Sequence, residues 1–134
     1  MLKQLSIYAE NKKGALQAMT NALYEAGINI WGSVTNDGAE YGINRMVVSD
    51  PDTAKKVLTE KGYLCRFVDV LAVEIEDKPG ALNTLLTALL DSNVNVDYTY
   101  LSFNRDSSTP VMILHTADPE EVEICLKAKG FKMV

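Results

Sequence analysis

The chain has little of what metal, thiol and histidine chemistry requires. Its 134 residues include two cysteines, Cys65 and Cys125, and one histidine, His115. Neither cysteine belongs to a CxxC pair, so both are interpreted as small core residues rather than as a disulfide or a zinc site. A lone histidine in an apolar segment leaves a catalytic triad without partners, and we expect a satisfied strand histidine. The sequence therefore predicts no metal, no cofactor and no catalytic residue.

Long apolar runs and an excess of basic residues are also missing. No apolar run approaches the roughly 20 residues of a membrane span, and residues 1–4 lead into an alternating segment that does not resemble a signal peptide. Lys and Arg total 13 against 18 Asp and Glu, a net charge of -5, which argues against binding to phosphates. We expect a cytoplasmic protein that binds neither nucleic acid nor a membrane.

What the sequence does have is an internal repeat with an offset of 66 positions. The shift lays Glu10-Asn11-Lys12-Lys13-Gly14-Ala15-Leu16 over Glu76-Asp77-Lys78-Pro79-Gly80-Ala81-Leu82, and Ile28-Asn29-Ile30 over Val94-Asn95-Val96. A two-residue slip follows where a hairpin loop is expected, and loops absorb length changes easily. Beyond the slip, Asp50-Pro51 falls on Asp118-Pro119. The pattern predicts two homologous domains, 1–68 and 69–134, joined by a short tether around Val68-Asp69.

Each unit alternates between strand and helix periodicity. First strands precede the glycine turns, and apolar residues at helical spacing then predict amphipathic helices of about three turns, stopped at Gly27 and Asn93. Second strands are expected to open at Ile28 and Val94. Turns at 36–38 and 104–108 lead into third strands at 43–49 and 111–116.

The second half of each unit begins with a helix start signal. Asp50 and Asp118 are predicted helix caps, each followed by proline at the first helical position. Fourth strands are expected from Tyr63 and Phe131. The order βαββαβ, twice, predicts an α+β fold of two ferredoxin-like modules in tandem, each an antiparallel sheet with helices on one face.

The first turn of each unit is the best candidate for a ligand site. Free backbone N–H groups after Gly14 or Gly80, at the positive end of a helix dipole, suit a carboxylate. Asn11 with Asn29, and Asp77 with Asn95, offer donors and acceptors that suit a zwitterionic amino acid. The pattern alone does not bring both members of a pair to one ligand, although they could face it across a pair of domains.

The turn D/N-x-x-G-A-L, paired with a later x-N-I/V in both units, resembles the ACT domain over nearly the whole chain. The resemblance implies a regulatory module that binds a free amino acid at the interface of two such domains. The residues it implicates are Asn11, Lys12, Lys13, Gly14, Ala15, Leu16, Asn29, Ile30, Asp77, Pro79, Gly80, Ala81, Leu82, Asn95 and Val96. Lys13 departs from the usual proline, present as Pro79, which puts the equivalence of the two sites in doubt.

Three functions are compatible with these residues. The leading hypothesis is a non-catalytic amino-acid sensor that acts through homodimer formation or through a metabolic enzyme or regulator. The second is an assembly subunit without a ligand, in which the glycines only form turns. The third is a small ferredoxin-like hydrolase, which would need an arginine where Lys12-Lys13 and Lys78 stand. Arg45 is read as an ordinary sheet residue rather than as a carboxylate clamp.

Overall fold

The computed structural model describes residues 1–36, 38 and 41–134 of the chain. In chain order, its elements are β1 (Leu2–Glu10), α1 (Ala15–Glu25), β2 (Ile30–Asn36), β3 (Tyr41–Val48), α2 (Pro51–Glu60), β4 (Leu64–Glu74), α3 (Ala81–Asp91), β5 (Tyr98–Phe103), β6 (Pro110–His115), α4 (Pro119–Ala128) and β7 (Lys132–Met133). They form two compact units. We call Lys3–Val68 the N-terminal module and Asp69–Val134, with Met1–Leu2, the C-terminal module.

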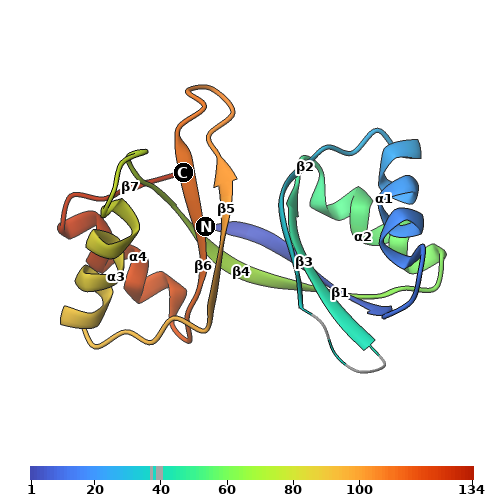
Figure 1. Cartoon of the computed structure of the whole chain (residues 1–134), viewed down its shortest axis with the longest axis horizontal. Helices are drawn as coiled ribbons and strands as arrows, with labels where there is room; N and C mark the ends of the chain where they lie inside the picture. Colours follow the sequence, from blue (N-terminus) through green and yellow to red (C-terminus); the bar gives the residue numbers. More distant parts are fainter. Residues whose placement is uncertain (37, 39–40) are drawn as a thin grey trace. The chain divides into compact units, whose positions relative to one another are not determined.

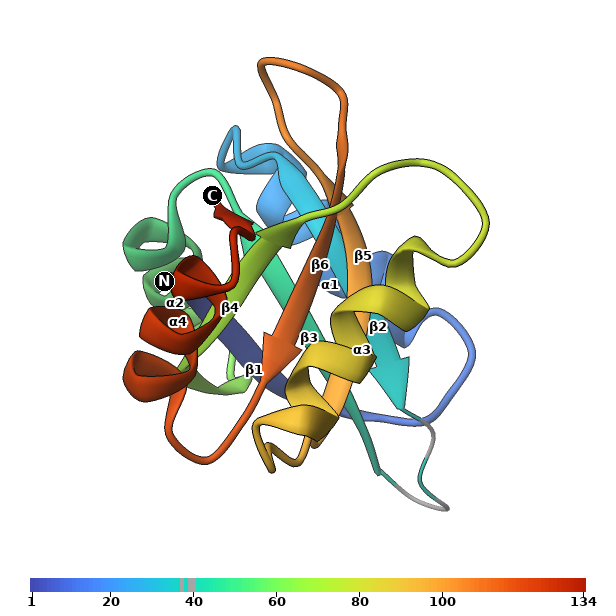
Figure 2. The ribbon, with the colours of Figure 1, turned by 90° about the vertical axis from the view of Figure 1, so that its left-hand side faces the viewer.

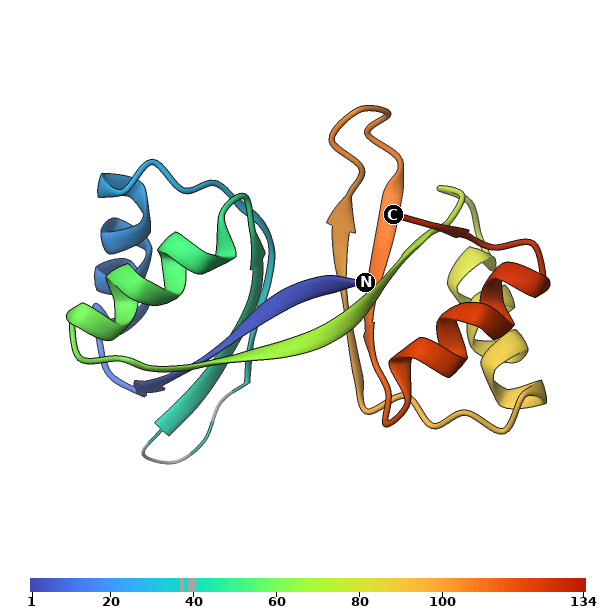
Figure 3. The same ribbon diagram turned by 180° about the vertical axis from the view of Figure 1, so that it is seen from behind.

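Each module contains a four-stranded sheet with two helices on one of its faces (Figures 1, 2 and 3). The strand order is β2-β3-β1-β4 in the N-terminal module and β5-β6-β4-β7 in the C-terminal module. In the first, Leu5 lies opposite Met46 and Glu10 opposite Tyr41 in an antiparallel pair. In the second, β4 and β5 both pair antiparallel with β6. The prediction of two ferredoxin-like α+β modules is confirmed.

The predicted tether around Val68-Asp69 is wrong. Both residues lie inside β4, whose beginning belongs to the N-terminal module and whose end belongs to the C-terminal module. The segment LCRFVDVLAVE has no glycine or proline and is rich in valine and other strand formers, so nothing in it stops the strand. One strand thus serves as the last of one repeat and the first of the next.

The second strands begin later than the repeat predicts. β2 starts at Ile30 and β5 only at Tyr98, so Val94-Asn95-Val96 lies outside the strand. Asn29 is tied to the end of β3, since its N–H donates to Ser49 Oγ and its carbonyl accepts from Ser49 N–H. Asn95 instead donates from its side chain to Asp97 Oδ1 at 3.1 Å. A local side-chain bond therefore replaces the start of the ladder in the second copy.

The two hairpins and the chain end show smaller differences. The third strands lie within two residues of their predicted bounds, and β7 is only two residues long. The turn at 104–108 closes as predicted, with Ser108 N–H donating to Asn104 O and Asp106 N–H to Asn104 Oδ1. The other predicted turn includes Asp37, which lies outside the described residues.

Equivalent positions of the repeat build the two cores. Each apolar cluster takes residues from the first and third strands of its module and from both helices. The matched buried pairs are Leu5 and Leu71, Ile7 and Val73, Met19 and Leu85, Leu23 and Leu89, Met46 and Leu114, and Leu58 and Leu126. Two core positions change character: buried Val48 of the first core corresponds to Thr116 of the second copy, and Met112 of the second core corresponds to buried Asn44 of the first copy.

The two predicted Asp caps differ. Asp50 accepts a hydrogen bond from Thr53 N–H at 3.2 Å, and hydrogen bonds from Thr53 hold the pKa of Asp50 below its ordinary value. Asp118 precedes Pro119 in the same way, yet its side chain makes no cap hydrogen bond. The prediction of a cap is confirmed for Asp50 and wrong for Asp118, where the first turn closes through backbone bonds alone.

The caps give a matched test of stability. We expect Asp50→Ala to lower the free energy of unfolding several times more than Asp118→Ala, because only Asp50 satisfies a helix amide. The lowered pKa of Asp50 stabilises the fold above the carboxyl's unfolded pKa, and this contribution disappears as pH falls through the folded pKa. Urea denaturation of both variants at neutral and acidic pH measures the difference. Equal losses in the two variants would contradict the cap assignment.

Candidate functional site

The turn that leads from β1 into α1 has the geometry of an anion site. Gly14 takes a left-handed conformation with φ 84° at the helix N-cap position. Ala15 N–H bonds to Lys12 O at 3.2 Å, and Ala18 N–H to Gly14 O at 3.0 Å. Within the described part of the chain, the Leu16 and Gln17 amides between them have no hydrogen-bond acceptor. They point outward at the positive end of the helix dipole.

The turn before α3 repeats this geometry. Gly80 has φ 87°, Ala81 N–H bonds to Lys78 O at 3.2 Å, and Thr84 N–H bonds to Gly80 O at 2.8 Å. Thr84 Oγ1 donates to the same carbonyl at 3.0 Å. The replacement of proline by Lys13 in the first copy therefore leaves the backbone of the turn unchanged.

A pocket of about 280 Å³ opens beside the first turn, and we call it the Gly14 pocket. Five predicted residues line it, namely Asn11, Lys12, Gly14, Ala15 and Leu16. Its far wall is formed by β2 and β3, where Asn44 Nδ2 donates to Thr35 Oγ1 at 2.7 Å. Lys13 lines a second pocket of about 570 Å³ on the other side of the same turn, next to Tyr41 and Tyr63.

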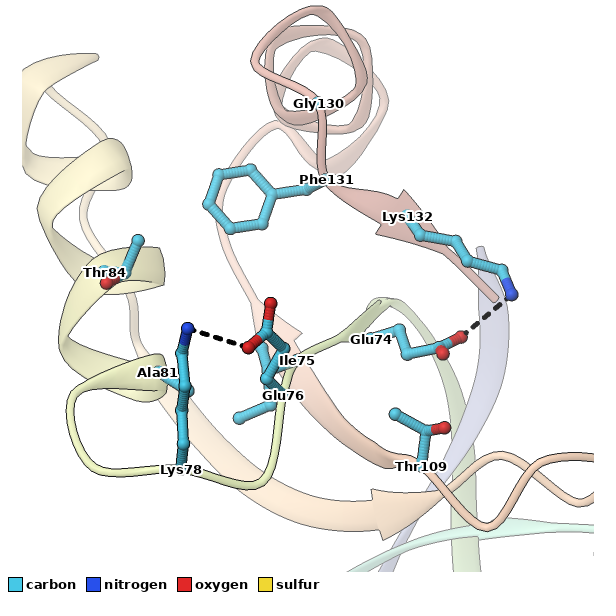
Figure 4. A pocket seen from close by; sticks show the side chains of 10 residues that line it. All are labelled: Glu74, Ile75, Glu76, Lys78, Ala81, Thr84, Thr109, Gly130, Phe131 and Lys132. Atoms are coloured by element: carbon cyan, nitrogen blue, oxygen red, sulfur yellow. Dashed lines mark ion pairs between the residues drawn. The ribbon is translucent and has the colours of Figure 1, made fainter.

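The C-terminal module has a pocket of about 360 Å³ beside its own turn, the Gly80 pocket (Figure 4), which by the repeat corresponds to the 570 Å³ pocket and not to the Gly14 pocket. Two ion pairs cross it: Lys78 Nζ lies 2.8 Å from Glu76, and Lys132 Nζ lies 3.2 Å from Glu74. Figure 4 shows the Phe131 ring on the helix side of the pocket, giving an apolar wall beside the charges. Paired charges next to an apolar surface suit a ligand that carries charges of both signs.

Glu74 is the most tightly held of these carboxylates. Desolvation raises its pKa, but hydrogen bonds from Lys132 and from Asn104 outweigh burial and hold the pKa of Glu74 below its ordinary value. Asn104 Nδ2 lies 3.3 Å from Glu74 Oε2. Glu74, Phe131 and Lys132 were not among the predicted site residues, because only the pairing of β4 with β7 brings them to the turn.

The strand-start residues lie at the opposite end of each module. β2 pairs with β3 from Ile30 opposite Val48, whereas the Gly14 turn follows Glu10, opposite Tyr41. Seven residues of β3 separate these two levels, a distance of about 23 Å. Asn29 and Asn11 of one module therefore cannot touch the same small ligand. Asn95 lines a fourth pocket, at the end of the C-terminal module away from Gly80.

Several predicted residues line none of the pockets described above. These are Asp77, Pro79, Gly80 and Leu82 around the second turn, and Asn29, Ile30 and Val96 at the strand starts. Gly80 nevertheless shapes its pocket, because its positive φ directs the helix amides.

The lone histidine and the cysteines lie apart from both turns. His115 Nδ1 lies 2.8 Å from Asp97 Oδ2, and its ring stacks on Tyr98 with centroids 5.0 Å apart, as expected of a satisfied strand residue. Burial raises the pKa of the Cys65 thiol, an effect that Lys55 partly offsets.

Among residues 1–36, 38 and 41–134, no three His, Cys, Asp or Glu side chains lie close enough to hold a metal ion. No helix of this part is long and apolar enough to cross a membrane.

Two ferredoxin-like modules in tandem, each with a glycine turn before its first helix and a pocket beside that turn, make up the chain. The sequence model of the ACT domain pair matches residues 1–133, and the chain therefore belongs to the ACT domain family. The resemblance noted in the sequence is confirmed.

Solved structures show the same fold. Protein BT0572 from Bacteroides thetaiotaomicron is 31% identical, with a TM-score of 0.90 over 99% of this chain and 91% of that one. The ligand-free regulatory subunit of aspartate kinase from Thermus thermophilus is 16% identical, with a TM-score of 0.68 over 96% and 90%. The corresponding Thermus flavus subunit is 18% identical, with a TM-score of 0.60 over 96% and 91%. Among curated proteins, none matches significantly.

The Glu74 network can be tested by titration. We expect Lys132→Met and Asn104→Ala each to raise the pKa of Glu74, because each removes a hydrogen bond to the carboxylate while its burial remains. A depressed folded pKa stabilises the fold above the unfolded pKa, and this contribution is lost as pH falls through the folded pKa. NMR titration of the side-chain carboxyl measures the shift, with Lys127→Met as the control cation. An unchanged Glu74 titration in both variants would show that the network does not hold the carboxylate.

Proposed function

We propose that this chain is a non-catalytic amino-acid sensor whose ACT modules bind a free amino acid at the glycine turns. The observation that carries the proposal is the repeated turn, with φ near 84° and 87° and first-turn helix amides that lack acceptors among the described residues. Such amides bind a carboxylate through charge-assisted hydrogen bonds. Membership in the ACT domain family supports a regulatory role for this site.

The ammonium group of the ligand would be bound by polar residues near the carboxylate. Asp77 can accept from an ammonium group directly, and Asn11 can accept through its amide oxygen. Asn29 lies too far from the turn of its own module to do so, by the register of β3. Asn95 precedes Tyr98, which pairs with His115 at the other end of β6 from Val111, the partner of Glu74. These two asparagines can contribute only if a second module, of this chain or of another copy, supplies the turn.

The signal would pass through association rather than chemistry. A ligand that prefers one arrangement of modules stabilises that arrangement. The coupling free energy then changes the affinity of the chain for a partner protein. We propose a homodimer, or a complex with a metabolic enzyme or regulator, in the cytoplasm. Free amino acids are available there as ligands.

A thermal-shift screen against the standard amino acids tests the proposal. One amino acid should raise the unfolding midpoint, and at 100 times its dissociation constant it adds about 2.7 kcal/mol of stability. Asn11→Ala, Asp77→Ala, Asn29→Ala and Asn95→Ala should separate the turn residues from the strand-start residues by their effects on affinity. Asn21→Ala, on the exposed side of α1, is the matched control and should leave affinity unchanged.

The alternatives predict different results. A ligand-free assembly subunit would show no shift with any amino acid at millimolar concentration. A midpoint shift that persists unchanged in all four site variants would place the ligand elsewhere and refute the turn site.

A further inference from the structure

The C-terminal module carries a second polar pocket, at the end away from the Gly80 turn. Its volume is about 430 Å³, and its lining residues lie at the end of α3 and the start of α4. We call it the Thr116 pocket. Thr116, Asp118 and Glu121 line it on the β6 and α4 side, and Ser92 lines it at the end of α3. A volume of this size accommodates a small molecule.

The floor of the Thr116 pocket contains an unsatisfied hydroxyl. Thr116 is 2% exposed, and its Oγ1 has no hydrogen-bond partner among the described residues. Side chains alternate along a strand, so Thr116 points to the same face of the sheet as core residue Leu114, the face that carries the helices and this pocket. A buried hydroxyl without a partner destabilises the fold, and a bound polar group would remove that cost.

The duplication provides an internal control for this pocket. The position equivalent to Thr116 in the N-terminal module is Val48, a buried core residue. Glu121 corresponds to Thr53, and Ser92 to Ala26. The N-terminal module builds the same strands and helices without these polar groups. The fold therefore does not require them in the C-terminal module.

Two carboxylates at the pocket are not used by the protein itself. Across the described chain, neither the Asp118 carboxylate nor the Glu121 carboxylate has a hydrogen bond or an ion pair. Asp50, which is the equivalent residue in the N-terminal module, instead accepts a hydrogen bond from the Thr53 N–H. A third acid, Asp97, is already held by Asn95 at 3.1 Å and by His115 at 2.8 Å. The carboxylates of the pocket that have no partner in the described chain are thus those of Asp118 and Glu121.

We infer that the Thr116 pocket binds a small organic cation that carries primary ammonium groups. The carboxylates of Asp118 and Glu121 form ion pairs with these groups, and the Thr116 hydroxyl accepts a hydrogen bond from one of them at the floor of the pocket. An ammonium group donates three hydrogen bonds, and both carboxylates and a hydroxyl oxygen accept them. A bare metal ion is the poorer occupant, because no three ligating side chains converge in the described residues. This inference does not depend on amino-acid binding at the glycine turns.

Calorimetric titration of the full chain with 1,4-diaminobutane tests the inference. The diamine should bind, 1,4-butanediol of the same length should not, and added salt should weaken the diamine because its partners are partly exposed. NMR spectra of labelled protein should show the diamine shifting the amide signals of Thr116, Asp118 and Glu121.

Conservative variants separate binding from folding. Thr116→Val, which restores the residue of the N-terminal module, should raise the melting temperature of the free protein and weaken diamine binding. Asp118→Asn and Glu121→Gln should each weaken binding about fivefold, the effect expected of losing one partly exposed charge pair. Glu120→Gln on the same helix turn and Asp50→Asn at the equivalent cap should leave affinity unchanged.

Four outcomes would overturn the inference. They are absence of diamine binding at millimolar concentration, equal binding of the uncharged diol, binding that survives all three site variants, and Mg²⁺ displacing the diamine at equimolar concentration. Variants that lower stability without changing diamine affinity would show that Asp118 and Glu121 serve only the dipole of α4. A failed amino-acid screen with intact diamine binding would refute the turn site alone.

Discussion

The chain must turn from a strand into a helix at the same point of both modules, and only a left-handed residue makes the turn short enough. Gly14 and Gly80 provide it, with φ of 84° and 87°. A residue with a Cβ would meet no neighbouring atom at either position, so backbone strain, not crowding, selects glycine. The same conformation leaves the next helix amides without acceptors. The requirement of the fold and the chemistry of the site therefore have one cause.

Duplication makes the differences between the two copies informative. Lys13 and Pro79 differ in sequence but support the same turn, so this exchange changes the charge and not the backbone. The exchange of Val48 for Thr116 also keeps the backbone, but it changes the interior of the module. A buried hydroxyl replaces a methyl group, and this lowers the stability of the C-terminal module. A costly polar group in one copy only is best explained by a local role.

Periodicity, glycine stops and Asp-Pro pairs were sufficient to predict the βαββαβ order and both turns, because these signals act within a few residues. What they could not predict depends on partners distant in sequence. Asp50 and Asp118 have the same Asp-Pro signal, yet only Asp50 caps its helix. The charge pairing of Glu74 with Lys132 requires β7 to lie beside β4. The sequence repeat ends near Val68, and a break between two strands was therefore expected there. The continuous strand β4 shows that the boundary of the repeat is not a boundary of the structure.

The register of β3 has a consequence for any regulatory mechanism. Because the turn and the strand-start asparagine of one module are about 23 Å apart, a single amino acid cannot join them within that module. Either the asparagines serve only the local backbone, as Asn29 does with Ser49, or they meet a ligand held by another module. In the second case, the ligand contacts two modules at once, so its binding free energy differs between the arrangements of those modules. Such a difference is the physical requirement for allosteric coupling.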